Sequence, residues 1–210
     1  MPYDSTTPGD RPLSIEEFAR LPAEDCRLEL VRGRVVREPL PGFEHGSVAD
    51  ELHFRLREFV RRRALGRVVG RTGFVLFDVP PTVRGPDVAF VAAERIRERG
   101  APRGFWRGAP DLAVEVVSPA NARRALREKI DEYLMARARQ VWVVDPRTWT
   151  VAVHAPGAQP AVYGGGVAVA PPGSERDVLG GGAVLPGFRL SVAALFAAAD
   201  APGGGPAPGT

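Results

Sequence analysis

Apolar and polar residues alternate with two different periods along this chain, and each change of period marks an expected element. Across residues 45–63 the apolar side chains recur every three or four positions, which predicts a long amphipathic helix. Residues 27–31 and 34–38 have the shorter period of strands, and the Arg32-Gly33 step between them predicts a tight turn. These patterns together predict a β-hairpin followed by a helix.

A short helix is expected before this hairpin. Ser14 followed by Glu17 has the spacing of a capping box, in which each side chain binds a free backbone N–H of the first turn. Leu13 and Phe18 flank this box and are expected to pack against each other as a hydrophobic staple. The helix should end near Leu21.

Three strand candidates follow the long helix. They cover residues 68–70, 74–79 and 87–91, and Gly and Pro turns separate them. A β-meander is the simplest arrangement of these strands. Residues 94–98 are expected to form a helical turn after them.

Two nearly continuous apolar runs, residues 112–117 and 140–145, flank a predicted helix over residues 121–138. Strands that are buried on both faces and joined through a helix are typical of a parallel β-α-β crossover. We therefore predict an α/β fold of mixed α+β type, in which these two strands lie at the centre of a mixed β-sheet flanked by helices.

The remainder of the chain carries weaker signals. Past Trp149 we expect short strands around two Gly-rich turns, residues 164–166 and 180–182, and a last helix over residues 192–198.

The length of 210 residues suits one domain. We expect residues 1–12 to form a flexible N-terminal arm and residues 13–200 to form the single domain. Residues 201–210 contain only Ala, Pro, Gly and Thr and are expected to be a disordered tail.

The composition excludes several classes of protein. With 44% hydrophobic and 25% charged residues it is that of a soluble globular protein. No window approaches the roughly 18 apolar residues of a membrane span, and the N-terminus lacks the pattern of a secretory signal. The single cysteine, Cys26, cannot close an intrachain disulfide. We therefore expect a cytoplasmic protein without a membrane segment.

The formal net charge of +3 hides an unusual bias among the basic residues. Of the 28 Lys and Arg residues, Lys129 is the one lysine. Arginine presents a broad planar fork that stays charged, whereas lysine is a compact point charge whose pKa responds to burial. Lys129 is therefore a candidate for a site that requires the compact charge, and its survival by chance is the alternative.

Two acids stand where the local pattern is apolar. Glu115 is the one polar residue in the run Leu112–Val117, and an ionised carboxylate in a strand buried on both faces must be protonated, paired or bound to a metal. Asp87 stands at the start of another apolar strand and could meet Glu115 across the sheet.

Lys129 completes the candidate site. It follows Leu126 by three positions and precedes Tyr133 by four, so it lies on or beside the inward face of the helix after Glu115. A buried ion pair with Glu115, or a lysine stem that carries its charge to solvent, is the structural alternative. Adding Asp87 makes a purely structural cluster unfavourable, because two acids repel, but suits a hard divalent cation.

These residues resemble a known nuclease signature. The run Pro86-Asp87 followed by Glu115-Val116-Val117 is similar to the motif of PD-(D/E)XK nucleases, although Val117 stands where that motif has its lysine. The wider sequence, over residues 13–197, resembles the Uma-two family of restriction endonucleases. The segments that carry this resemblance are "RLELVRGRVV", "RGPDVAFV", "APDLAVEVVSP", "KIDEYLMARARQVWVVDP" and "LPGFRLSVAALF". In that family the lysine is displaced to the following helix, which is the position of Lys129.

The resemblance implies a function and two further site residues. It implies a Mg²⁺-dependent endonuclease, with Mn²⁺ as a substitute, that cuts DNA to leave 5′-phosphate ends and acts as a homodimer. Asp87 and Glu115 are then metal ligands, Glu29 an upstream acidic ligand, and His45 a further catalytic candidate. From the residues alone, Glu29 could equally be a solvent-facing strand residue and His45 a structural residue at a helix end.

Two rival functions remain open. One is a non-catalytic nucleic-acid or partner-binding module that retains the nuclease fold, and the other is a hydrolase of small phosphoesters. The arginines between Arg55 and Arg71 could follow a phosphate backbone or form a solvated face.

Overall fold

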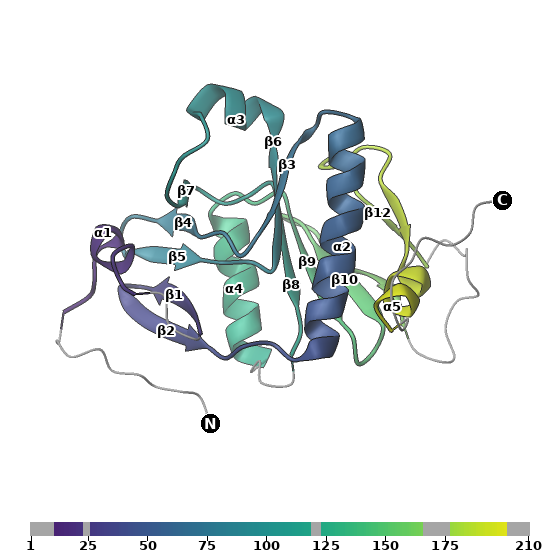
Figure 1. Ribbon diagram of the computed structural model, residues 1–210, viewed down its shortest axis with the longest axis horizontal. Helices are drawn as coiled ribbons and strands as arrows, with labels where there is room; N and C mark the ends of the chain where they lie inside the picture. Colours follow the sequence, from purple (N-terminus) through teal and green to yellow (C-terminus); the bar gives the residue numbers. More distant parts are fainter. Residues whose placement is uncertain (1–10, 23–25, 119–122, 166–176, 201–210) are drawn as a thin grey trace.

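The computed structural model describes residues 11–22, 26–118, 123–165 and 177–200 (Figure 1). Most of the predicted arm and the whole predicted tail, residues 1–10 and 201–210, lie outside the described residues. The helices are α1 (Ile15–Phe18), α2 (Phe43–Arg62), α3 (Ala93–Arg99), α4 (Arg123–Met135) and α5 (Val192–Asp200). The strands are β1 (Arg27–Val31), β2 (Arg34–Glu38), β3 (Gly66–Gly70), β4 (Phe74–Phe77), β5 (Thr82–Arg84), β6 (Val88–Ala92), β7 (Trp106–Arg107), β8 (Leu112–Val116), β9 (Gln140–Asp145), β10 (Thr150–His154), β11 (Ala161–Gly164), β12 (Val178–Gly180) and β13 (Arg189–Ser191).

The predicted crossover forms the centre of the larger sheet. This sheet has the strand order β11-β10-β9-β8-β6-β3, and β8 and β9 are parallel neighbours connected through α4. The other neighbouring strands in this sheet are antiparallel. The mixed α+β architecture predicted from the two apolar runs is therefore confirmed.

The predicted β-meander is wrong. β3 pairs directly with β6, whereas β4 joins a second sheet of order β2-β1-β5-β4-β7, which includes the unpredicted short strands β5 and β7. The physical reason is burial on both faces of β4. Phe74 and Leu76 pack into the core beneath α4, while Val75 packs into a separate core with Phe18 and Leu30. β4 therefore lies between two layers.

The larger sheet is covered on both faces. α2 and α5 supply apolar side chains to the core on one face, and α4 and β4 supply those on the other. Along β8, Val114 and Val116 face the α2 core and Ala113 faces the α4 core. Because side chains alternate along a strand, Glu115 shares the face of Ala113 and is directed to the α4 side.

The N-terminal hairpin forms as predicted, whereas the helix before it, α1, ends at Phe18 and not near Leu21. Ser14 and Glu17 make both hydrogen bonds of the capping box. β1 and β2 have the predicted bounds, and both turn residues have left-handed backbone angles, with φ of 51° at Arg32 and 79° at Gly33. A Cβ atom added at Gly33 would lie 2.3 Å from Cβ of Pro12, so this turn requires glycine for close packing as well as for its backbone.

Within the described ranges, none of the helices combines the length and the apolar character that a membrane crossing requires.

Candidate active site

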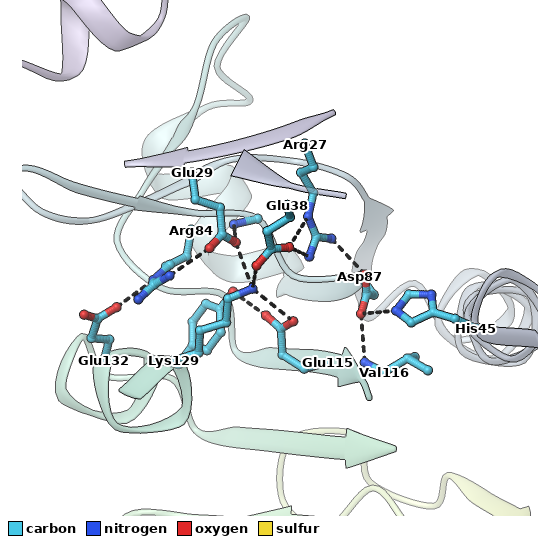
Figure 2. A network of polar contacts seen from close by, with 12 residues as sticks. Arg27, Glu29, Glu38, His45, Arg84, Asp87, Glu115, Val116, Lys129 and Glu132 are labelled. Carbon is cyan, nitrogen blue, oxygen red and sulfur yellow. Dashed lines mark hydrogen bonds and ion pairs between the residues drawn. The ribbon is translucent and has the colours of Figure 1, made fainter. Parts of the chain in front are cut away.

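Asp87 lies just before β6 and faces Glu115 across the sheet. β6 pairs with β8 so that Val88 is opposite Val114, and the Asp87 N–H donates to the carbonyl of Val114 at 3.0 Å. Continuing this register by one residue places Asp87 opposite Glu115. The expected meeting of the two acids across neighbouring strands is therefore present (Figure 2).

The two carboxylate oxygens of Asp87 have different partners. Oδ2 accepts a hydrogen bond from the Val116 N–H at 2.8 Å, and His45 Nε2 lies 3.3 Å from the same oxygen. Oδ1 accepts from Nη1 of Arg27 at 2.8 Å. Although burial opposes ionisation, the contacts with His45 and Arg27 lower the pKa of Asp87 to about 2. Asp87 is therefore ionised at neutral pH.

Glu115 lies on β8 with 1% of its surface exposed. Its Oε1 accepts a hydrogen bond from the Tyr133 hydroxyl at 2.9 Å, and its Oε2 lies 3.6 Å from Nζ of Lys129. Burial, supported by the negative charges of Asp87 and Glu29 and opposed by Lys129, raises the pKa of Glu115 to about 7. Glu115 therefore changes protonation state near neutral pH.

Lys129 brings its ammonium into the middle of three carboxylates. From α4, its Nζ donates to Oε1 of Glu38 and lies 3.2 Å from Oε1 of Glu29, in addition to its contact with Glu115. Burial disfavours the ammonium, but the three carboxylates more than compensate and raise the pKa of Lys129 above its ordinary value. The side chain is 6% exposed, so the alternative of a lysine that reaches solvent is wrong.

Glu29, on β1, is fully buried, so the alternative of a solvent-facing strand residue is also wrong. Its Oε2 accepts from Nη1 of Arg84 at 2.8 Å, and its Oε1 accepts from the Gly85 N–H at 3.0 Å. Burial opposes its ionisation, and the charges of Lys129 and Arg84 overcome that effect and lower the pKa of Glu29. Both oxygens thus bind donors that fix the carboxylate in place.

Arg27 and Glu38 belong to the site although sequence reasoning did not select them. They face each other across the hairpin, because Arg27 begins β1 and Glu38 ends β2. Arg27 Nε donates to Oε2 of Glu38 at 2.9 Å, while Oε1 of Glu38 binds Lys129 (Figure 2). The signal was available, because the predicted hairpin already places these opposite charges in register.

Arg84 and Glu132 extend the network away from Asp87. Arg84 is 5% exposed, and its Nε donates to Oε2 of Glu132 on α4 at 2.7 Å while its Nη1 binds Glu29. Neither residue carried a sequence signal, because arginine is common throughout the chain and Glu132 lies in an ordinary amphipathic helix. This ion-pair chain ties the smaller sheet to α4.

A cleft of about 1090 Å³ opens beside the network. Asp87, Arg27 and Glu38 line it, whereas Glu115 and Lys129 are not among its lining residues. Its other walls come from the region of α1, from the start of α2 and from the connection between β3 and β4. The candidate site therefore reaches this cleft through Arg27, Glu38 and Asp87.

The cluster is rich in carboxylates, but each of them already contacts a positive charge. Among the described residues, no three histidine, cysteine, aspartate or glutamate side chains form a group that could hold a metal ion as they stand. Guanidinium and ammonium groups from Arg27, Arg84 and Lys129 lie between the carboxylates instead.

The basic stretch between Arg55 and Arg71 is divided between two roles. Arg55 and Arg62 form ion pairs with Glu51 and Glu58, four residues earlier on the exposed face of α2. Arg71 lines the cleft. The solvated-face interpretation therefore fits the helix, and the cleft contains one member of the stretch.

Two comparisons with known proteins give a match. The model of the Uma2 family, described as "Putative restriction endonuclease", matches residues 15–193. A crystal structure from Anabaena variabilis ATCC 29413, described as that of "a putative nuclease belonging to DUF820", superposes with a TM-score of 0.74 at 22% sequence identity. The match covers 89% of this chain and 98% of that chain, and it shows a shared fold. No curated protein matches.

Proposed function

The chain belongs to the Uma2 family of restriction-endonuclease-like proteins, and from this membership we propose that it is a metal-dependent endonuclease that hydrolyses DNA phosphodiester bonds. One observation carries the proposal. Asp87, Glu115 and Lys129, which are distant in sequence, converge from the start of β6, from β8 and from α4 on one buried cluster beside a cleft.

The donor set fits a hard divalent cation such as Mg²⁺, for which Mn²⁺ can substitute. Carboxylate oxygens are the ligands that such ions prefer, and the guanidinium of Arg27 already occupies a cation position at Oδ1 of Asp87. Asp87 and Glu115 would hold the ion. A bound divalent cation supplies an acidified water and neutralises charge on the phosphoryl oxygens.

The contacts of Glu29 favour a supporting role in this proposal instead of the ligand role expected from the sequence. One of its oxygens binds Arg84 and the other binds the Gly85 N–H and approaches Lys129. Glu29 thereby fixes the position of the Lys129 ammonium.

Lys129 acts in the proposal as a cation and hydrogen-bond donor. The three surrounding carboxylates hold its pKa above the ordinary value, so it retains its proton at neutral pH and does not serve as the general base. A fixed positive charge in a buried site stabilises the negative charge that develops on phosphorus oxygens. His45 positions Asp87 through the 3.3 Å contact with Oδ2.

The test is cleavage of supercoiled plasmid DNA with Mg²⁺ and with a chelator. Wild-type protein should nick or linearise the plasmid only with the metal, and Asp87→Ala, Glu115→Gln and Lys129→Met should each lose this activity. Arg62→Met is the matched control, because Arg62 is 72% exposed at the far end of α2 and pairs only with Glu58 among the described residues.

Cleavage by the three site variants that equals cleavage by wild type and by Arg62→Met would overturn the proposal. DNA retention that depends steeply on salt, without cleavage or metal binding, would instead support the non-catalytic binding module. Hydrolysis of a chromogenic phosphodiester without cleavage of DNA would support the small-phosphoester hydrolase.

A further inference from the structure

Arg27 holds the one oxygen of Asp87 that the sheet and α2 leave available. The Val116 N–H and His45 both approach Oδ2. Among the described contacts of Oδ1, the partner is Nη1 of Arg27, at 2.8 Å. A cation that binds Asp87 through Oδ1 therefore lies in direct contact with this guanidinium or takes its place.

Glu38 anchors Arg27 in that position. The two residues are paired across the β1–β2 hairpin, and Nε and Nη2 of Arg27 both donate to Oε2 of Glu38. The other oxygen of Glu38 binds Lys129, so Glu38 joins Arg27 to Lys129 (Figure 2). The guanidinium is therefore held by a fixed partner and does not meet Asp87 by chance.

The Arg27–Glu38 pair also lies on the route from the cleft to the buried part of the site. Arg27 and Glu38 line the cleft and have 27% and 22% of their side chains exposed, whereas Glu115 and Lys129, at 1% and 6%, do not line it. Asp87 lines the cleft too, so a metal ion that enters from the cleft meets Asp87 with Arg27 and Glu38 beside it.

We infer that Arg27 competes with the divalent cation for Oδ1 of Asp87, and that metal binding requires the guanidinium to leave. The inference rests on the proposed function for the identity of the cation. A guanidinium and a divalent ion repel each other and cannot both contact one carboxylate oxygen without a large electrostatic cost. Arg27 is thus a positioning residue that balances the negative charge of the carboxylates until the metal replaces it.

This role predicts that replacing Arg27 changes the affinity for the metal in the opposite direction to replacing a residue that only supports the metal site. Loss of a residue that only supports a metal site weakens metal binding, because the ligands lose their orientation. Loss of Arg27 should instead strengthen metal binding, because it frees Oδ1 and removes one positive charge near Asp87, Glu29 and Glu115.

The experiment is calorimetric titration of the full chain with Mn²⁺ at pH 8. Wild type is compared with Arg27→Met, with Arg27→Gln and with the control Arg62→Met, which removes the same charge at the other end of α2, about 25 Å along the helix from His45. Circular dichroism melting establishes that each variant is folded, and the second Arg27 variant serves if the first does not fold. Both Arg27 variants should bind Mn²⁺ about tenfold more tightly than wild type, and the control should match wild type.

The outcomes separate this inference from the proposed function. Binding to the Arg27 variants with none to wild type supports the inference, as does the tenfold gain. If wild type binds Mn²⁺ as tightly as the Arg27 variants do, or more tightly, the inference is overturned and the metal site of the proposed function remains intact. Absence of binding to all four proteins overturns both.

Discussion

The ammonium of Lys129 lies 3.6 Å from the carboxylate of Glu115, although α4 and β8 present these residues to each other from different layers. Both groups are buried, and each perturbs the other. Lys129 lowers the pKa of Glu115, against a stronger effect of burial, and Glu115 raises the pKa of Lys129. The lone lysine of the chain is therefore held as a permanent cation beside an acid that titrates near neutral pH.

Replacing Lys129 by Arg should abolish most of the proposed nuclease activity while preserving the fold. The guanidinium keeps the positive charge, but its planar fork cannot occupy the compact position between Glu29, Glu38 and Glu115. We expect the rate of plasmid cleavage to fall about 100-fold, the loss typical of one displaced electrostatic contact. Single-turnover cleavage and a melting curve measure the two effects separately.

Lys129→Met is the companion variant. It removes the charge, so the three carboxylates lose their shared cation, and we expect it to destabilise the fold by about 3 kcal/mol or more. Plasmid cleavage by Lys129→Arg within a factor of about three of the wild-type rate would show that any cation suffices at this position.

Replacing Glu115 by Gln should change how stability depends on pH in metal-free protein. The pKa of Glu115 is raised from its ordinary 4.5 to about 7, so the folded chain binds the proton more tightly than the unfolded chain does. The stabilising contribution is complete below pH 4.5 and is lost as the pH rises through 7. Its size is on the order of 3 kcal/mol, and glutamine cannot contribute it.

Melting curves between pH 4.5 and 8, recorded with a chelator, measure this difference. The melting temperature of wild type relative to Glu115→Gln should fall steadily as the pH rises and should level off above pH 7. Groups far from Glu115 titrate equally in both proteins, so their effects cancel in the comparison, and Asp87 and Lys129 stay ionised over this range because the pKa of Asp87 is lowered and that of Lys129 is raised. Two parallel curves over this range would contradict the raised pKa.

The central part of the candidate site was predictable because its signals are local. Glu115 is the polar exception in an apolar strand, and Lys129 falls on the inward stripe of a helix, so each residue is conspicuous within its own element. The crossover then brings the two elements together. Arg84, which binds Glu29 and Glu132, was less visible, since it has no local feature that separates it from the many other arginines of the chain.

The fold shows the same division between local and distant information. The hairpin, α2 and the β8-α4-β9 crossover follow from periodicity, and their bounds agree with the structure to within a few residues. The sheet that β4 joins depends on partners far along the chain, since its pairing with β7 joins Phe74 to Trp106. A local pattern reports that a strand is buried on both faces but not which layers bury it.

Replacing Arg84 by Met should destabilise the fold strongly. Arg84 is 5% exposed and binds Glu29 and Glu132, so its removal leaves two carboxylates in the interior without their shared partner. Breaking a buried ion pair from one side typically costs about 3 to 5 kcal/mol. Arg55→Met is the matched control, because Arg55 pairs with Glu51 on an exposed helix face, where the cost is about 0.5 kcal/mol or less. Chemical denaturation of the three proteins measures both values, and similar losses for the two variants would contradict the assignment of Arg84 to a buried network.

Two glycine-to-alanine substitutions should shift stability in opposite directions. Gly33 has a φ of 79°, and an added Cβ would lie 2.3 Å from Cβ of Pro12, so Gly33→Ala must strain the turn and push the chain before α1 away from it. The expected loss exceeds about 1 kcal/mol. Gly46 lies within α2, and an added Cβ would meet no atom within 4 Å. Gly46→Ala should therefore stabilise the protein by up to about 1 kcal/mol through helix propensity. A melting temperature of Gly33→Ala equal to or above that of wild type would mean that close packing of the hairpin turn against Pro12 does not contribute to the stability of the fold.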